Sequence, residues 1–173
     1  MKQLFAPWRH AWVTSSAARG EDLPGGGNPC LFCRVWDAAD ADEEHLVVHR
    51  GTLALVMLNR FPYNGGHLLI APREHRGALE ALTPASRAAC MELAAQALTA
   101  LGGLYRPDGF NVGINQGRAA GAGIPEHVHL HVVPRWNGDT NFTTTVGDTR
   151  VISQDLARTR ADVAAAFAGQ VTG

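Results

Sequence analysis

The central part of the chain consists of short apolar runs separated by turn residues, a pattern typical of an antiparallel sheet. Gly51-Thr52 between the first two runs predicts a hairpin. The turn Tyr63-Asn64-Gly65-Gly66 precedes the third run. The predicted strands cover residues 46–50, 53–58, 67–71, 110–116 and 127–133.

A different spacing predicts two helices. Thr83 fits the N-cap and Pro84 the first position of a helix over residues 84–101, in which apolar residues recur at spacing four and which Gly102-Gly103 ends. A second helix is expected over residues 154–168. We therefore predict an α+β domain: an antiparallel sheet of about five strands with the first helix packed on it and a C-terminal helix beyond.

The last predicted strand carries histidines at alternate positions, His127, His129 and His131, with apolar residues between them. Because successive side chains point to opposite faces, one face of this strand is apolar and the other is imidazole. A rise of about 3.3 Å per residue would place the rings about 7 Å apart. Such a row suits nucleophilic, proton-transfer or metal chemistry; the alternative is an accidental run of surface histidines.

The loop before this strand is rich in glycine, so its backbone N–H groups can approach an anion. Neighbouring amide side chains can add donors. The residues of this predicted phosphate cradle are Gly121, Gly123, Asn111, Asn115 and Gln116. Taken alone, the glycines would be ordinary turn residues, but a neutral imidazole beside a cradle can attack phosphorus and form a phosphoramidate.

Length and charge narrow the class of protein. A chain of 173 residues suggests one domain, 1–173, with an arm and a Gly/Pro loop over 1–29, a core over 30–142 and a C-terminal extension over 143–173. A net charge of −1, from 15 basic and 16 acidic residues, predicts no nucleic-acid partner. No apolar run would span a bilayer or act as a signal peptide, so we expect a cytoplasmic protein without a membrane partner.

Cys30 and Cys33 form a C-x-x-C pair, which in a reducing compartment indicates metal or redox use. A tetrahedral zinc needs two more ligands, and His75 and one histidine of the last strand are candidates because their strands can share a sheet. The alternative is a redox pair, which usually lies at a helix start after a strand.

The other residues of these types have weaker signals. Cys90, within the first helix, is expected in the core. His10, His45 and His49 are expected at the surface. Trp136 can stack on a base or anchor its own connection.

Two motifs together resemble the histidine triad superfamily of nucleotide hydrolases and transferases. They are His127-x-His129-x-His131 followed by Val132-Val133, and Gly66-His67-Leu68-Leu69-Ile70-x-Pro72-x-x-His75. The resemblance extends from about Cys30 to Phe142. Four further segments look like the bacterial branch that includes diadenosine tetraphosphate phosphorylases, namely 5–9, 59–64, 109–113 and 134–142.

The resemblance implies cleavage of a dinucleoside polyphosphate at an α-phosphate. His129 would be the nucleophile that forms a nucleotidyl-histidine, His131 would bond the phosphate or the leaving group, and phosphate or water would accept the nucleotidyl group. Asn59 would bind the ribose and Gln116 the phosphates. Ala122 and Gly123 stand where other branches carry a Ser or Gln side chain, so phosphate contact there would come from the backbone. His67 would contact the nucleotide or, slightly favoured, support the strand.

The resemblance also implies a structural zinc held by Cys30, Cys33, His75 and His127. If zinc takes His127, that ring cannot also relay protons, and the chemistry depends on His129 and His131. Relatives pair as homodimers through the helix and a sheet strand, which we expect here as well.

The same residues are compatible with other functions. One is hydrolysis of a nucleoside phosphoramidate, and another is nucleotide binding with incidental turnover. A hydrolase with zinc at the triad itself is less favoured because it leaves Cys30 and Cys33 unexplained.

Overall fold

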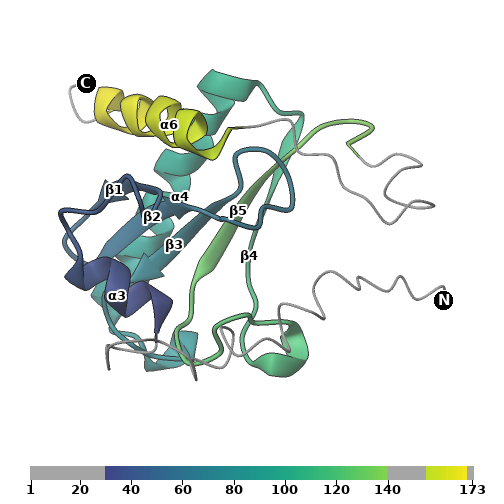
Figure 1. Cartoon of the computed structure of the whole chain (residues 1–173). Helices are drawn as coiled ribbons and strands as arrows, with labels where there is room; N and C mark the ends of the chain where they lie inside the picture. Colours follow the sequence, from purple (N-terminus) through teal and green to yellow (C-terminus); the bar gives the residue numbers. More distant parts are fainter. Residues whose placement is uncertain (1–29, 140–154, 171–173) are drawn as a thin grey trace, which may run out of the picture.

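A computed structural model describes residues 30–139 and 155–170 (Figure 1). The helices and strands follow the chain in the order α3 (Leu31–Asp37), β1 (Val47–Arg50), β2 (Ala54–Leu58), β3 (Leu68–Pro72), η1 (Leu79–Ala81), α4 (Pro84–Tyr105), β4 (Gly109–Ile114), η2 (Arg118–Ala120), β5 (Leu130–Arg135) and α6 (Leu156–Gln170). The predictions for the arm 1–29, for residues 140–142 and for most of the C-terminal extension lie outside the described residues.

The strands form one antiparallel sheet in the order β1-β2-β3-β5-β4, which confirms the predicted fold class. The Gly51 N–H donates to the Ala54 carbonyl at the predicted hairpin. Strand β5 pairs with β3 on one side and with the edge strand β4 on the other. His131, the last histidine of the triad, therefore lies on a strand that is paired on both sides.

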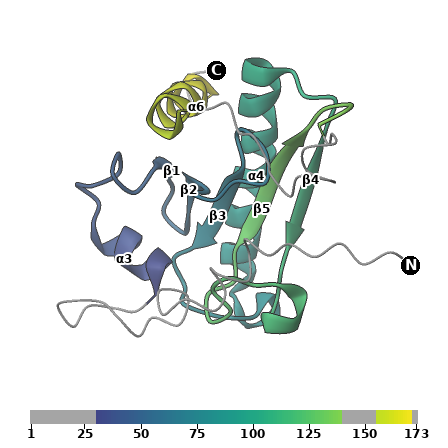
Figure 2. The ribbon, with the colours of Figure 1, turned by 45° about the vertical axis from the view of Figure 1, so that its right-hand side comes forward.

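One face of the sheet packs against α4 and α6 (Figures 1 and 2). The Thr83 side chain accepts a hydrogen bond from the Ser86 N–H at 3.2 Å, so it is the N-cap of α4 that the sequence predicts. Alternate strand residues meet the two helices in this core, which includes Val56, Ile70, Leu130, Val132, Leu93, Leu101, Val163 and Phe167. Cys90 is buried in it, as predicted.

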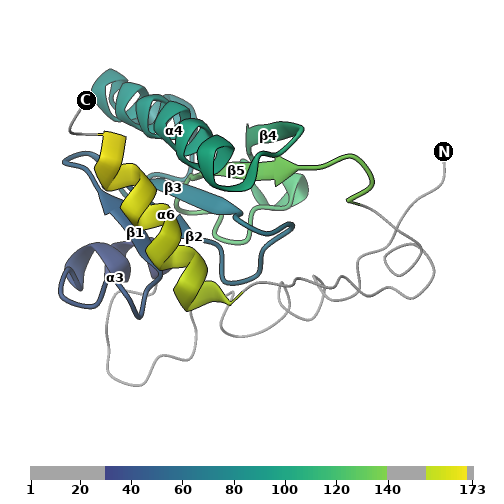
Figure 3. The same ribbon diagram turned by 90° about the horizontal axis from the view of Figure 1, so that it is seen from above.

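The opposite face is covered over β1, β2 and β3 by helix α3, so the sheet lies between α4 and α3 (Figure 3). Phe32 and Val35 of α3 are fully buried against Leu55 and Leu69. The sequence analysis did not predict this helix, because seven residues are too few for a clear period. Helix α3 therefore creates a second core on the face of the sheet that carries the imidazoles.

Helix α4 runs to Tyr105, four residues past the predicted end. A side chain at Gly102 or Gly103 would meet nothing within 4 Å, so these glycines are ordinary helix positions on an open side. Tyr105 packs against the core, and Arg106 ends the helix in the left-handed region at φ 46°. Packing of the last turn therefore overrides the glycine signal.

The prediction of one regular strand over residues 127–133 is wrong at its start, because the β5 ladder begins at Leu130. His127 and His129 precede the ladder, and only His131 lies within it, opposite Leu69 of β3 and Gly113 of β4. The rings of His129 and His131 are 4.9 Å apart instead of the expected spacing of about 7 Å. Because His127 and His129 lie outside the ladder, their rings can have different hydrogen-bond partners from that of His131.

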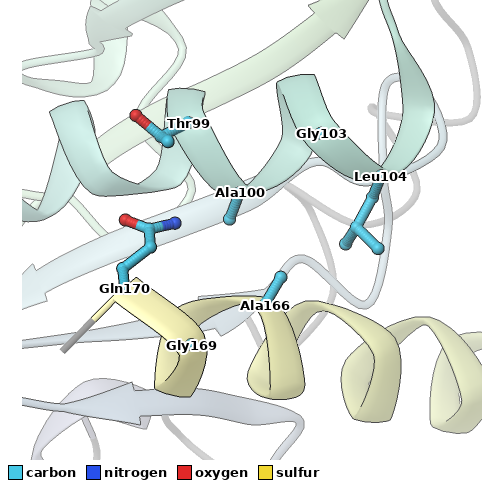
Figure 4. A pocket seen from close by; sticks show the side chains of 7 residues that line it. All are labelled: Thr99, Ala100, Gly103, Leu104, Ala166, Gly169 and Gln170. Atoms are coloured by element: carbon cyan, nitrogen blue, oxygen red, sulfur yellow. The ribbon is translucent and has the colours of Figure 1, made fainter. Parts of the chain in front are cut away.

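A hollow of about 290 Å³ lies between the C-terminal parts of α4 and α6 (Figure 4). Its lining is Thr99, Ala100, Gly103, Leu104, Ala166, Gly169 and Gln170. None of these side chains titrates, and the hollow is on the side of the sheet away from α3, so it is not the site of the predicted chemistry. None of the described helices is long and apolar enough to cross a membrane.

Candidate active site and metal centre

Two chain segments meet beside the sheet and bring the histidines together. The Val128 N–H donates to the Arg76 carbonyl at 2.6 Å. A Cβ on Gly77 would lie 2.6 Å from the Pro125 carbonyl oxygen, so only glycine allows this close approach. The contact places His75 beside His127, with ring centroids 5.2 Å apart.

His129 is held by the backbone of its own segment. Its Nδ1 lies 2.9 Å from the His127 carbonyl oxygen, which can only accept a hydrogen bond. We therefore assign the proton to Nδ1, which leaves a lone pair on Nε2. The ring is 5% exposed, packs 4.8 Å from Phe32, and burial lowers its pKa, so the neutral imidazole is maintained.

The hydrogen bond with His67 gives His131 the tautomer opposite to that of His129. The Tyr63 N–H, which can only donate, lies 3.0 Å from His67 Nδ1, so that nitrogen must be the acceptor. His67 Nε2 therefore carries the proton and donates it to His131 Nδ1 at 3.0 Å. Burial, with smaller contributions from His131 and His129, lowers the pKa of His67 to about 3, so His67 remains neutral. In neutral His131 the proton is then on Nε2.

Neighbouring rings thus offer complementary groups. His129 offers a lone pair at Nε2 and His131 an N–H at Nε2, with ring centroids 4.9 Å apart. Phosphoryl transfer needs a nucleophile and a donor for the oxygens around phosphorus, and this pair supplies both.

The first triad histidine belongs to a different cluster, with Cys30, Cys33 and His75. Their donor atoms all lie within 4.8 Å of one another. His127 Nε2 is 2.9 Å from the Pro72 carbonyl and must donate to it, so the lone pair is on Nδ1. That nitrogen is 3.2 Å from Cys30 Sγ, 3.7 Å from Cys33 Sγ and 3.3 Å from His75 Nδ1.

These spacings suit a tetrahedral metal. A zinc ion with Zn–N bonds of about 2.05 Å and Zn–S bonds of about 2.3 Å would separate its ligand atoms by about 3.3–3.8 Å. Burial raises the pKa of the Cys30 thiol to about 11, so a bound metal would have to displace its proton. The C-x-x-C pair does open a helix, as a redox pair often does, but two imidazoles complete a four-ligand set compatible with zinc.

Comparisons with known proteins agree with this geometry. The model of the HIT domain matches residues 41–138 of the chain. The chain belongs to the HIT family. This confirms the family that the motifs resemble.

Several relatives of this HIT protein cover much of its length. An AP-4-A phosphorylase of Mycobacterium tuberculosis is 38% identical over 170 residues, 98% of this chain and 86% of that relative. An adenosine 5′-monophosphoramidase of Schizosaccharomyces pombe is 31% identical over 108 residues, 62% of this chain and 75% of that relative. A solved structure of a zinc-bound histidine triad family protein from Mycobacterium smegmatis superimposes with a TM-score of 0.66 at 28% identity, covering 83% of this chain and 96% of that one.

The HIT fold brings some of the predicted substrate residues to the triad. Asn59 Nδ2 is 3.3 Å from His67 Nδ1, beside the Tyr63 N–H. Gly113 pairs with His131, and a Cβ there would meet nothing within 4 Å, so β4 leaves space beside the His131 ring. Asn111 shares the face of β4 that contains Gly113, because alternate residues of a strand point the same way, whereas Asn115 follows the last residue of this strand.

Other predicted substrate residues have structural partners. The Gln116 side chain accepts from the Leu79 N–H at 2.9 Å and donates to Glu80 at 3.1 Å, so it is bound to η1. The Asn111 amide oxygen accepts from Arg135 at 2.8 Å. The Gly121 N–H donates to the Arg118 carbonyl in a tight turn, which leaves the N–H of Gly123 as the better candidate for an anion contact.

The sequence analysis missed two residues of the site. Phe32, between the paired cysteines, packs on both His127 and His129, at 5.1 and 4.8 Å between ring centroids. Tyr63 stacks with His131 at 5.9 Å and sets the tautomer of His67. The only signals were an aromatic inside the C-x-x-C pair and an aromatic before the turn glycines. The expectation that His49 is a surface residue is wrong, because it is half-buried and stacks with Phe167 of α6.

Proposed function

We propose that this HIT protein cleaves dinucleoside polyphosphates of the diadenosine tetraphosphate type at an α-phosphate, through a nucleotidyl intermediate on His129. The observation that carries the proposal is the pair of opposite tautomers, a lone pair on His129 and an N–H on His131. The 38% identity to an AP-4-A phosphorylase over nearly the whole chain supports the enzyme class and the substrate.

In the first step, His129 Nε2 attacks the α-phosphorus and the bond from phosphorus to the bridging oxygen breaks. The proton stays on Nδ1, where it is donated to the His127 carbonyl, so the nucleotidyl-imidazole is cationic and remains a good leaving group. A neutral His131 with its proton on Nε2 would become an imidazolate if it gave up that proton. It therefore stabilises the departing polyphosphate by a hydrogen bond, and the nucleotide leaves as an anion.

In the second step, an acceptor oxygen attacks the same phosphorus and the P–N bond breaks. With inorganic phosphate as acceptor, diadenosine tetraphosphate yields ADP and ATP; with water it yields AMP and ATP. We favour phosphate because the relative that covers 98% of this chain is a phosphorylase. Asn59 and the backbone at Gly123 are the proposed contacts to ribose and phosphate.

Product analysis tests this proposal. Purified protein is incubated with diadenosine tetraphosphate with and without inorganic phosphate, alongside His129→Gln and the matched control His45→Gln. We expect ADP and ATP only when phosphate is present, a nucleotidyl adduct on the peptide that contains His129, and neither in His129→Gln. The absence of product from the wild type, or equal product from His129→Gln, would overturn the proposal.

A second candidate is hydrolysis of adenosine 5′-monophosphoramidate, favoured by the relative from Schizosaccharomyces pombe. The same His129 intermediate would form, with an amine in place of the polyphosphate as the leaving group. Competition between the two substrates in one assay, with kcat/KM for each, decides which is preferred.

We further propose that Cys30, Cys33, His75 and His127 hold a structural zinc ion. The donor spacing, the assigned lone pair on His127 Nδ1 and the zinc-bound relative support this choice. Bound zinc would join α3 to the segments that carry His75 and His127. No disulfide joins the described cysteines, which suits the cytoplasmic location that we propose.

We also propose a homodimer formed through β4 and the outer side of α4. Strand β4 is an edge of the sheet, and Val112 and Met91 are 43% and 59% exposed. Light scattering should give twice the 18.5 kDa mass of the chain, and Val112→Glu should shift it to the monomer. A wild-type mass of one chain would contradict the dimer.

A further inference from the structure

The turn after β5 is built around the carboxylate of Asp139. Arg135 donates to it from Nε at 2.6 Å and from Nη2 at 2.8 Å, and the Trp136 N–H donates at 3.2 Å. The Asp139 side chain is 9% exposed, and the hydrogen bonds from Arg135 hold the pKa of this carboxyl well below its usual range. The carboxylate is therefore ionised and fixed in one orientation.

A fourth hydrogen bond to Asp139 comes from a distant part of the chain. Asn64, in the loop between β2 and β3, donates from Nδ2 to Asp139 at 2.8 Å and to the Pro134 carbonyl at 3.0 Å. The hydrogen bonds from Arg135 and Trp136 to Asp139 would be enough to close the turn. The contact with Asn64 instead fixes the β2–β3 loop relative to the end of β5.

This loop determines the hydrogen bonding of the triad. Asn64 follows Tyr63, whose N–H reaches His67 Nδ1, and the Asn64 carbonyl accepts from the His67 N–H at 3.2 Å. A shift of the loop would remove the donor that forces His67 to donate to His131. It would also move the Tyr63 ring off His131.

We propose that Asp139 is a positioning residue for the reaction: through Asn64 and Tyr63 it fixes the tautomer of His67 and hence the N–H that His131 presents to substrate. The consequence for turnover rests on the function proposed above. The tautomer itself does not, so it is measured separately.

Asp108 provides a matched control. Its carboxylate also ties this turn, accepting from the Asn137 N–H at 2.7 Å, and this hydrogen bond does not involve the β2–β3 loop. If Asp139 only closed the turn, Asp108→Ala and Asp139→Ala would have similar effects. If Asp139 acts through Asn64, only Asp139→Ala and Asn64→Ala would alter the histidines.

The experiment combines nitrogen-15 NMR of labelled imidazoles with kinetics on diadenosine tetraphosphate. We expect Asp139→Ala and Asn64→Ala each to replace the single Nε2–H form of His67 by a mixture of tautomers and to lower kcat by about 10-fold to 100-fold. The double variant should be no worse than the more affected single variant. Asp139→Asn, which keeps an acceptor for Asn64, should restore most of the kcat, and Asp108→Ala should resemble the wild type.

Wild-type tautomers in both Asp139→Ala and Asn64→Ala would overturn the proposal, as would an equal change in Asp108→Ala. If Asp139→Ala does not fold, Asn64→Ala decides, because it leaves the ion pair between Arg135 and Asp139 intact. If the wild type does not turn over the dinucleotide, the proposed function fails, whereas the NMR spectra still test the role of Asp139.

Discussion

Two histidine clusters lie side by side in this fold and differ in what the backbone does to each ring. In the cluster of Cys30, Cys33, His75 and His127, the Pro72 carbonyl accepts a hydrogen bond from Nε2–H of His127, which leaves the Nδ1 lone pair facing the ligand atoms of the other three residues. At His129 the His127 carbonyl accepts a hydrogen bond from Nδ1–H, which leaves the lone pair on Nε2. In the function proposed above, a histidine would thus be a metal ligand or a nucleophile according to which of its ring nitrogens donates a hydrogen bond to a carbonyl.

The substitution with the largest expected effect removes the proposed nucleophile. His129→Gln should lower kcat by about 10⁴-fold to 10⁶-fold, the scale seen when a covalent nucleophile is lost. Rapid-quench kinetics would measure it, with His45→Gln as the control. A loss smaller than about tenfold would contradict the role of His129 as the nucleophile.

Metal removal tests the other cluster. Cys33→Ser should lower the zinc content from one ion per chain and reduce the free energy of unfolding by about 3 kcal/mol, the linkage expected when free metal is 100-fold above its Kd. Elemental analysis and chemical denaturation would measure the two effects. Cys90→Ala, on the buried face of α4, should keep the zinc. If it lost as much zinc as Cys33→Ser, the cluster would not be the site.

The stability of the fold should depend on pH through His67, which is hydrogen-bonded to His131. The pKa of His67 in the folded protein is about 3 against an ordinary value of 6.5, so the neutral form stabilises the fold above pH 6.5 and this contribution is lost as the pH falls toward 3. Between pH 7 and pH 5 the loss is about 2 kcal/mol. His67→Gln, which keeps an acceptor for Tyr63 and a donor for His131, should lack this loss, as urea denaturation at the two pH values would show.

The activity of His67 variants tests whether His67 sets the tautomer of His131. His67→Gln should retain kcat within about tenfold, whereas His67→Leu, which has neither donor nor acceptor, should lose about 100-fold. Equal activity of His67→Leu and the wild type would mean that the tautomer of His131 is not set by His67.

The smallest effect is expected at Gln116, whose side chain is bound to η1. Gln116→Ala should change kcat/KM by less than about threefold. Steady-state kinetics at several substrate concentrations would measure this change. A larger rise in KM would show that Gln116 leaves η1 to contact the phosphates.

Sequence reasoning reached the sheet, the helix α4 and the residues of both clusters because these depend on local patterns: alternation, an N-cap at Thr83, and ligand spacing at Cys30 and Cys33. It did not reach α3, because a seven-residue helix is defined by the core that Phe32 and Val35 enter and not by its own period. Nor did it reach the tautomers. These depend on single backbone groups of Pro72 and Tyr63, which come close to the rings only when the chain is folded.

The most direct test of the account is nitrogen-15 NMR of the wild-type histidine side chains at pH 7. The account predicts that His67 and His131 carry the proton on Nε2 and that His129 carries it on Nδ1. The same protonated nitrogen on His129 and His131, or a charged His67, would contradict the assignment of nucleophile and donor on which the proposed reaction depends.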